Sequence, residues 1–300
     1  MDLGPSNMGP WSLAATTPPI YQPYATTASI LSGMGVSQDF TSAMPIRYIH
    51  RRVPGADIYF ISNASDTAVD SICAFRTVGH VPEWWNPDTG ETRALPNYAV
   101  KGGITTLKVH LAPFESGFVV FQKPGNHGDP KSVNFPEYWP LATLKQPWTV
   151  SFDPRWGGPA SVTFDTLDDW SKRPEDGIKH YSGKATYTTS FDAPARTPHG
   201  TYALSLGEVK NLASVTLNGH DLGIVWCAPW RVAVPPSYLN PTGNRLEITV
   251  ANLWSNRLIG DAGKPESERL SHTAYSEYNA NSPLQPSGLL GPVTLEVAGR

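Results

Sequence analysis

The chain has 300 residues, of which 16% are charged, and its formal net charge is −3. No run rich in Lys and Arg occurs, so the composition excludes a basic surface for nucleic acid or for an anionic membrane. No stretch of about 18 apolar residues and no signal peptide is visible. The length suffices for two domains, and the 26 Gly, the 29 Pro and the 11% of aromatic residues favour β-sandwiches over helical bundles.

Residues 1–44 are rich in Pro, Ser, Thr and Gly, and we expect an extended lead-in segment that packs on the first module. A weakly helical stretch lies within it at residues 25–34. From residue 45 onward, short stretches alternate apolar and polar residues, and turn residues separate them. Strands are expected at residues 46–52, 57–63, 69–76, 105–111 and 116–122, with a loop and turn at residues 82–90. This spacing predicts a β-sandwich over residues 45–124.

Residues 125–145 are predicted to be a linker, because they lack apolar periodicity and contain three prolines. A second module is expected over residues 146–300. Its strongest local feature is Asn218-Gly219, a two-residue hairpin turn. Further strands are expected at residues 148–152, 161–164, 182–191, 201–206, 213–217, 231–234, 245–252 and 291–297. About eight strands predict a jelly roll, so the fold class is all-β with two β-sandwich modules.

The second module carries a series of motifs in a fixed order. They are Tyr-Ser-Gly-Lys-Ala-Thr-Tyr at 181–187, Leu-Gly-Glu-Val at 206–209, Val-Thr-Leu-Asn-Gly at 215–219, Asn-Arg-Leu-Glu-Ile-Thr-Val-Ala-Asn at 244–252 and Trp-Ser-Asn-Arg-Leu-Ile-Gly-Asp at 254–261. This series resembles the galactose-binding-like jelly roll that accompanies glycoside hydrolases such as the family 2 β-galactosidases.

The resemblance is closer to the C-terminal part of the large bacterial α-L-rhamnosidases of glycoside hydrolase family 106. It also includes residues 35–40, 46–63, 75–90, 116–121 and 286–293. The family's catalytic carboxylates lie on an α/β barrel, and this chain shows no alternation of strands and helices over about 200 residues. The family's catalytic residues therefore transfer to no position here. The resemblance implies a secreted or periplasmic origin and the tail of a longer protein.

Four tryptophans of the second module are candidates for sugar binding, because sugars stack their CH faces on indole rings. They are Trp170, Trp226, Trp230 and Trp254. The alternative is that each one caps the core of the sandwich. Asn256 and Arg257 are candidates as well, since a guanidinium can form paired hydrogen bonds with a ligand. The alternative for Arg257 is an ion pair with Asp261 that pins the loop.

Hydrolysis of a glycosidic bond needs two carboxyl groups, about 5–9 Å apart. The catalytic candidates are Glu83, Glu208 and Asp261. Glu83 lies beside Trp84 and Trp85, and an apolar wall raises the pKa of a carboxyl group, as a general acid requires. The alternative for each candidate is a solvated or hydrogen-bonded carboxylate at the surface.

The sequence contains no zinc-ligand or EF-hand spacing, and no metal is assigned to a catalytic site. Resemblance to other jelly rolls makes Asp153 and Asp165 candidates for a structural Ca²⁺, and no other cofactor is expected. Cys73 and Cys227 are expected to be buried free thiols.

Two functions remain open at this stage. The first is a glycoside-hydrolase-related, carbohydrate-active protein that recognises terminal galactosyl or rhamnosyl units and hydrolyses them with two carboxylates, as a β-galactosidase or α-L-rhamnosidase does. The alternative is a non-catalytic carbohydrate-binding accessory region of a larger rhamnosidase-like enzyme. The expected partner in both is an oligosaccharide or glycoside. A scaffold that binds another protein ranks last, because no exposed amphipathic helix or acidic tail is visible.

Overall fold

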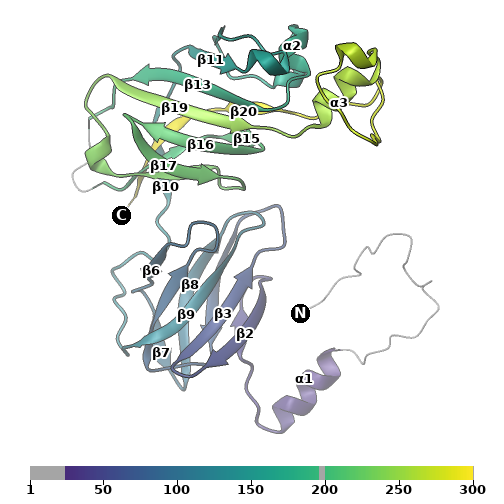
Figure 1. The fold of residues 1–300 in the computed structure, drawn as a ribbon. Coiled ribbons are helices and arrows are strands. Elements are labelled where there is room, and N and C mark those ends of the chain that lie inside the picture. Colours follow the sequence, from purple (N-terminus) through teal and green to yellow (C-terminus); the bar gives the residue numbers. More distant parts are fainter. Residues whose placement is uncertain (1–23, 196–199, 300) are drawn as a thin grey trace, which may run out of the picture. The chain divides into compact units, whose positions relative to one another are not determined.

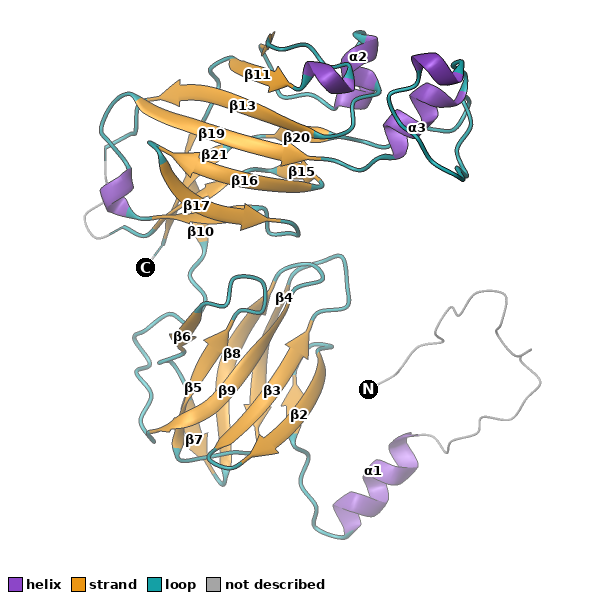
Figure 2. Cartoon of the chain, in the orientation of Figure 1, coloured by secondary structure: helices purple, strands orange, loops and turns teal. Residues whose placement is uncertain are grey.

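The computed structural model describes residues 24–195 and 200–299, and the first 23 residues of the predicted lead-in lie outside this range. The chain divides into two compact units, Met1–Phe135 and Pro136–Arg300. Both are built of antiparallel sheets, so the predicted all-β fold is confirmed (Figures 1 and 2). The boundary between the units falls inside the segment predicted to be a linker.

The first unit is a sandwich of two sheets, with strand orders β1-β4-β8-β7 and β2-β3-β9-β5-β6. Tyr59 and Phe121 of one sheet meet Phe75 of the other, at ring-centroid distances of 5.0 and 5.3 Å from Phe75. All three rings are fully buried, so the two sheets share one core. The strands are β1 (Phe40–Ser42), β2 (Arg47–Val53), β3 (Ala56–Ser62), β4 (Val69–Phe75), β5 (His80–Trp85), β6 (Thr92–Ala94), β7 (Ala99–Lys101), β8 (Ile104–Leu111) and β9 (Ser116–Pro124).

The lead-in differs from the expectation at both of its described ends. The helical stretch is present as α1 (Tyr24–Gly33), but none of its residues is buried, so this helix does not pack on the sandwich. In contrast, β1 pairs with β4 and buries Phe40 in the core. The first sandwich therefore begins before residue 45.

The second unit is also a sandwich, with strand orders β12-β11-β13-β19-β16-β17 and β10-β21-β14-β18 and an additional pair, β15-β20. Trp148, Tyr187 and Ile248 from the first sheet share a core with Leu204 and Leu295 from the second. The strands are β10 (Tyr138–Thr143), β11 (Trp148–Phe152), β12 (Val162–Phe164), β13 (Lys184–Phe191), β14 (Tyr202–Ser205), β15 (Glu208–Lys210), β16 (Leu212–Leu217), β17 (His220–Val225), β18 (Arg231–Val234), β19 (Asn244–Ala251), β20 (Gly288–Gly291) and β21 (Thr294–Ala298).

The structure places strand β10 inside the predicted linker. Tyr138 to Thr143 pair with β21 and form the edge of the second sheet. The predicted hairpin at Asn218-Gly219 joins β16 to β17, and both residues have positive φ, 53° and 83°, as a type I′ turn requires.

Short helices gather at one end of the second unit, where the six-stranded sheet ends (Figure 1). They are η1 (Pro154–Trp156), η2 (Trp170–Lys172), α2 (Asp176–Lys179), α3 (Ser255–Ala262) and η4 (Glu266–Glu268), while η3 (Pro236–Tyr238) lies elsewhere in the chain. Helix α3 follows closely after β19, so the sheet fixes its starting point. Within the described ranges, no helix is long and apolar enough to cross a membrane.

Candidate functional site

The buried carboxylate of Asp261 joins helix α3 to the loop that follows it and forms an ion pair within the helix. Nη1 of Arg257 donates to Oδ1 of Asp261 over 3.3 Å, and the two side chains are 4% and 3% exposed. Oδ2 of Asp261 accepts hydrogen bonds from the amide of Leu270 at 3.0 Å and from the amide and hydroxyl of Ser271 at 2.8 Å. Burial acts to raise the pKa of Asp261, but the Ser271 hydrogen bonds and the charge of Arg257 outweigh it and hold the pKa below its usual value.

Two further donors of Arg257 are used inside the protein. Nε and Nη2 donate to the carbonyl oxygen of His180 at 2.9 and 2.6 Å. Asn256 is buried too, and its side chain exchanges hydrogen bonds with the backbone of Gln285 at 2.7 and 2.8 Å. Of the two interpretations of Arg257, the structure therefore contains the ion pair that pins the loop. Neither Asn256 nor Arg257 presents its polar groups to a ligand, which corrects their assignment to substrate binding.

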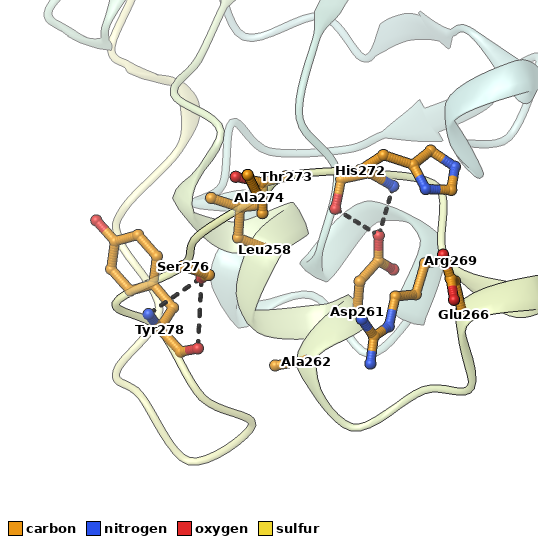
Figure 3. Close-up of a pocket in the computed structure, with 11 residues that line it drawn as sticks. Leu258, Asp261, Ala262, Glu266, Arg269, His272, Thr273, Ala274, Ser276 and Tyr278 are labelled. Carbon is orange, nitrogen blue, oxygen red and sulfur yellow. Dashed lines mark hydrogen bonds between the residues drawn. The ribbon is translucent and has the colours of Figure 1, made fainter.

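The pinned loop and α3 line a cavity of 480 Å³ that is open to solvent (Figure 3). This volume lies in the range of about 300–1,000 Å³ that is typical of small-molecule sites. Polar side chains dominate the wall. The lining residues are Leu258, Asp261, Ala262, Glu266, Arg269, Ser271, His272, Thr273, Ala274, Ser276 and Tyr278.

An exposed pair of tryptophans lies at the start of helix α3, which also lines the cavity. Trp254, which is 61% exposed, immediately precedes α3, and Trp156 of η1 is 39% exposed. Their ring centroids are 6.4 Å apart and their planes cross at 65°. The amide of Leu258, a residue of the cavity wall, donates to the carbonyl of Trp254 over 3.1 Å. Trp254 and this part of the cavity wall are therefore positioned by the same turn of helix, whereas Trp156 comes from η1.

The other candidate tryptophans have different surroundings. Trp170 is fully buried, and its Nε1 donates to the hydroxyl of Tyr187 over 2.5 Å. Its proposed role in sugar stacking is therefore corrected to one in the core. Trp230 is half-buried against the core, whereas Trp226 is exposed at the end of β17.

The three catalytic candidates are divided between the two units. Glu83 lies in the first unit and is buried, with its carboxylate bound by Lys123 at 2.5 Å and Gln122 at 2.9 Å. Burial acts to raise its pKa, but these hydrogen bonds outweigh burial and the pKa is lowered, so the expected rise is wrong. Glu208 lies in the second unit with Asp261, but it is exposed and pairs with Lys210 at 2.7 Å. Across the described ranges, no contact joins Glu208 to Asp261.

Of the two candidate metal ligands, Asp153 is bound by a neighbouring residue. Asp153 accepts a hydrogen bond from the amide of Arg155 at the start of η1 and forms an ion pair with its guanidinium at 2.7 Å. In the part of the chain that the structure describes, no three His, Cys, Asp or Glu side chains are grouped to hold a metal ion. Cys73 and Cys227 are not joined by a disulfide; Cys73 is buried as expected, and burial raises the pKa of its thiol to about 12, whereas Cys227 is only half-buried.

Sequence reasoning missed Trp156, Arg269 and His272. Trp156 stands between Pro154 and a pair of glycines, and such flanks are typical of an exposed turn. Arg269 and His272 lie in a segment without apolar periodicity, so nothing in the sequence distinguishes them from other loop residues.

Comparisons with known proteins agree with the motifs. Residues 21–100 match the profile of glycoside hydrolase family 106, described as alpha-L-rhamnosidase. A rhamnosidase structure from Novosphingobium sp. PP1Y matches with 36% identity and a TM-score of 0.83, over 90% of this chain and 26% of that chain. The chain resembles the β-sandwich region of the family 106 α-L-rhamnosidases. A protein of Formosa agariphila described as a beta-glucuronidase is 35% identical over 176 residues, which are 50% of this chain and 15% of that protein.

These matches confirm the predicted resemblance and relate the chain to glycoside hydrolases. The chain spans about a quarter of the length of the rhamnosidase and less of the glucuronidase. Residues 24–195 and 200–299 contain no α/β barrel, since their sheets are antiparallel.

Proposed function

We propose that the chain recognises carbohydrate without hydrolysing it, as an accessory region of a rhamnosidase-like enzyme, and that its ligands carry terminal rhamnosyl or galactosyl units. The observation that carries this proposal is the exposed pair of Trp156 and Trp254, of which Trp254 immediately precedes the helix that lines a polar cavity. A secreted or periplasmic location, where polymeric glycans are found, is part of the same proposal.

The geometry of the pair suits a sugar ring. Two indole planes that cross at 65° form adjoining walls, and one of them supports stacking of the CH face of the ring. The other contacts a substituent such as the methyl group of a rhamnosyl unit. The polar side chains of the adjoining cavity supply hydrogen-bond partners for hydroxyl groups.

The alternative, hydrolysis by Glu83, Glu208 and Asp261, has less support. A general acid must be protonated near neutral pH, which requires a raised pKa. The pKa values of Glu83 and Asp261 are both lowered, and their oxygens accept hydrogen bonds inside the protein. Glu208 is exposed and has no second carboxylate as a partner among the described residues.

A binding experiment tests the proposal directly. The purified chain is titrated with methyl α-L-rhamnoside and methyl β-D-galactoside, and tryptophan fluorescence and calorimetry report binding. We expect a dissociation constant between the micromolar and millimolar ranges, and Trp254→Ala should weaken it about fivefold or more. Trp226→Ala is the matched control, because Trp226 is similarly exposed in the same unit. The proposal fails if neither glycoside binds, or if Trp226→Ala and not Trp254→Ala abolishes binding.

A second measurement separates recognition from hydrolysis. Aryl α-L-rhamnosides and β-D-galactosides are incubated with the chain, and release of nitrophenol is followed. We expect none. Turnover that disappears on Asp261→Asn or Glu83→Gln, in a variant that still melts cooperatively, would establish the catalytic alternative.

A further inference from the structure

An exposed guanidinium, that of Arg269, stands in the wall of the cavity. Nε of Arg269 donates to the backbone carbonyl of Lys264 over 2.8 Å, which sets the orientation of the planar group. No carboxylate within residues 24–195 and 200–299 forms an ion pair with Arg269, so Nη1 and Nη2 keep their donors. Such a guanidinium is arranged in advance for two parallel hydrogen bonds to a carboxylate.

Two carboxylates, those of Asp261 and Glu266, line the same cavity. The charge of Asp261 is matched by Arg257 at 3.3 Å and Lys264 at 3.9 Å. The ring of His272 forms no hydrogen bond with another described residue, so its N–H is a second donor (Figure 3). Glu266 is the other carboxylate of the wall and is exposed.

We propose that this cavity binds the carboxylate of an acidic sugar, a hexuronate unit of the recognised glycan. The carboxylate forms paired hydrogen bonds with Nη1 and Nη2 of Arg269, and His272 donates a further bond. Glu266 and Ser276 take the ring hydroxyls as acceptors. The inference rests on the proposed function and names the class of sugar: the tryptophan pair takes a neutral terminal unit, and the cavity takes an acidic unit of the same glycan.

The size and chemistry of the cavity favour a uronate over a simple anion. A volume of 480 Å³ far exceeds the space that a small carboxylate fills, and the wall includes hydroxyl groups of Ser276, Thr273 and Tyr278 that match sugar hydroxyls. The hydroxyl groups of Thr273 and Ser276 already donate to the backbone carbonyls of Tyr275 and Tyr278, so towards a sugar hydroxyl they act as acceptors. The carboxylate and the sugar ring should therefore each contribute to binding.

Ligand-detected NMR titration of the intact chain tests this inference with D-galacturonate, D-galactose and acetate at low ionic strength. We expect galacturonate to bind more tightly than either of the other two. Arg269→Gln should weaken galacturonate about tenfold or more, because a charge-assisted pair of hydrogen bonds is lost, and should leave galactose within about twofold. Arg245→Gln is the control, since Arg245 is exposed and already paired with Glu247.

Three other outcomes would refute the acidic-sugar inference, and one of them would also refute the proposed function. Equal binding of galactose and galacturonate, unchanged by Arg269→Gln, refutes the acidic-sugar inference while rhamnoside binding through Trp254 still supports the proposed function. If acetate binds as tightly as galacturonate, the cavity is a general anion site, and the acidic-sugar inference is also refuted. If the intact chain binds neither rhamnoside, galactoside nor galacturonate, both proposals are refuted.

Discussion

Replacing Asp261 with Asn tests whether a buried charge holds the loop that forms the cavity. In the folded chain, Oδ2 accepts three hydrogen bonds from Leu270 and Ser271, and Oδ1 accepts one from Arg257. Asn has the same shape but only one acceptor oxygen. Its NH₂ group must therefore face either the three donors or the Arg257 guanidinium, and a donor cannot bond to a donor.

The loss in the free energy of unfolding depends on the burial of Arg257, the partner of Asp261. Removing one member of a buried ion pair costs about 3–5 kcal/mol, because the other charge is left in the interior without compensation. Arg257 keeps its two hydrogen bonds to the carbonyl of His180, so we expect the lower end, about 3 kcal/mol. In a unit of this size each kcal/mol shifts Tm by about 2–4 °C, which predicts a fall of about 6–12 °C for the second unit.

Calorimetric melting measures this shift, with Glu208→Gln as the control. Glu208 pairs with Lys210 at 2.7 Å, but the two side chains are 52% and 34% exposed, so losing this pair should cost less than about 1 kcal/mol. The double variant Arg257→Gln with Asp261→Asn should cost less than the two single variants added together, because no lone charge stays buried. If Asp261→Asn lowers Tm no more than Glu208→Gln does, the buried charge does not hold the loop.

Three further predictions concern the rest of the fold. Trp170→Ala should cost about 3–5 kcal/mol in denaturant unfolding, whereas Trp254→Ala should change the free energy of unfolding by about 0.5 kcal/mol or less. Gly219→Ala should cost about 1 kcal/mol from positive φ alone, and Gly207→Ala should cost clearly more, since its Cβ would lie 2.1 Å from the carbonyl oxygen of Gly291. Burial acts to raise the pKa of Asp57, but hydrogen bonds outweigh burial and the pKa is lowered. The ionised Asp57 therefore stabilises the folded chain above about pH 4, and this contribution is lost on acidification. In an acid titration, the free energy of unfolding of Asp57→Asn should depend less on pH than that of the unmodified chain.

The strands that the sequence predicted well are those whose inward residues recur at every second position. Residues 57–63 and 245–252 were expected as strands, and β3 and β19 occupy almost the same positions. Several strands were missed, among them β1, β6, β7, β15 and β17, and two of the missed strands contain proline. Pro140 lies in β10 at the edge of its sheet, and Pro82 lies at a register shift in β5, the two places where a strand tolerates a residue without an N–H.

The candidate site was harder to predict, because exposure of a side chain depends on the tertiary fold. Trp170 and Trp254 both occupy loop-like sequence, yet one is buried against Tyr187 and the other is largely exposed. The partner of Trp170 comes from a strand 17 residues further along the chain, and no local pattern indicates it. In contrast, Arg257 and Asp261 are four residues apart, a spacing that brings side chains together on a helix.

Helix α3 connects the interior of the second unit to the proposed ligand surface. On its inner side, Asp261 fixes Leu270 and Ser271 and so fixes the loop that carries Arg269 and His272. At its start, Trp254 is presented to solvent. Ligand groups that are held in place before binding lose little entropy on binding. It follows that a change at Asp261, which lies too deep to contribute its oxygens to a sugar, should weaken galacturonate binding in a protein that remains folded.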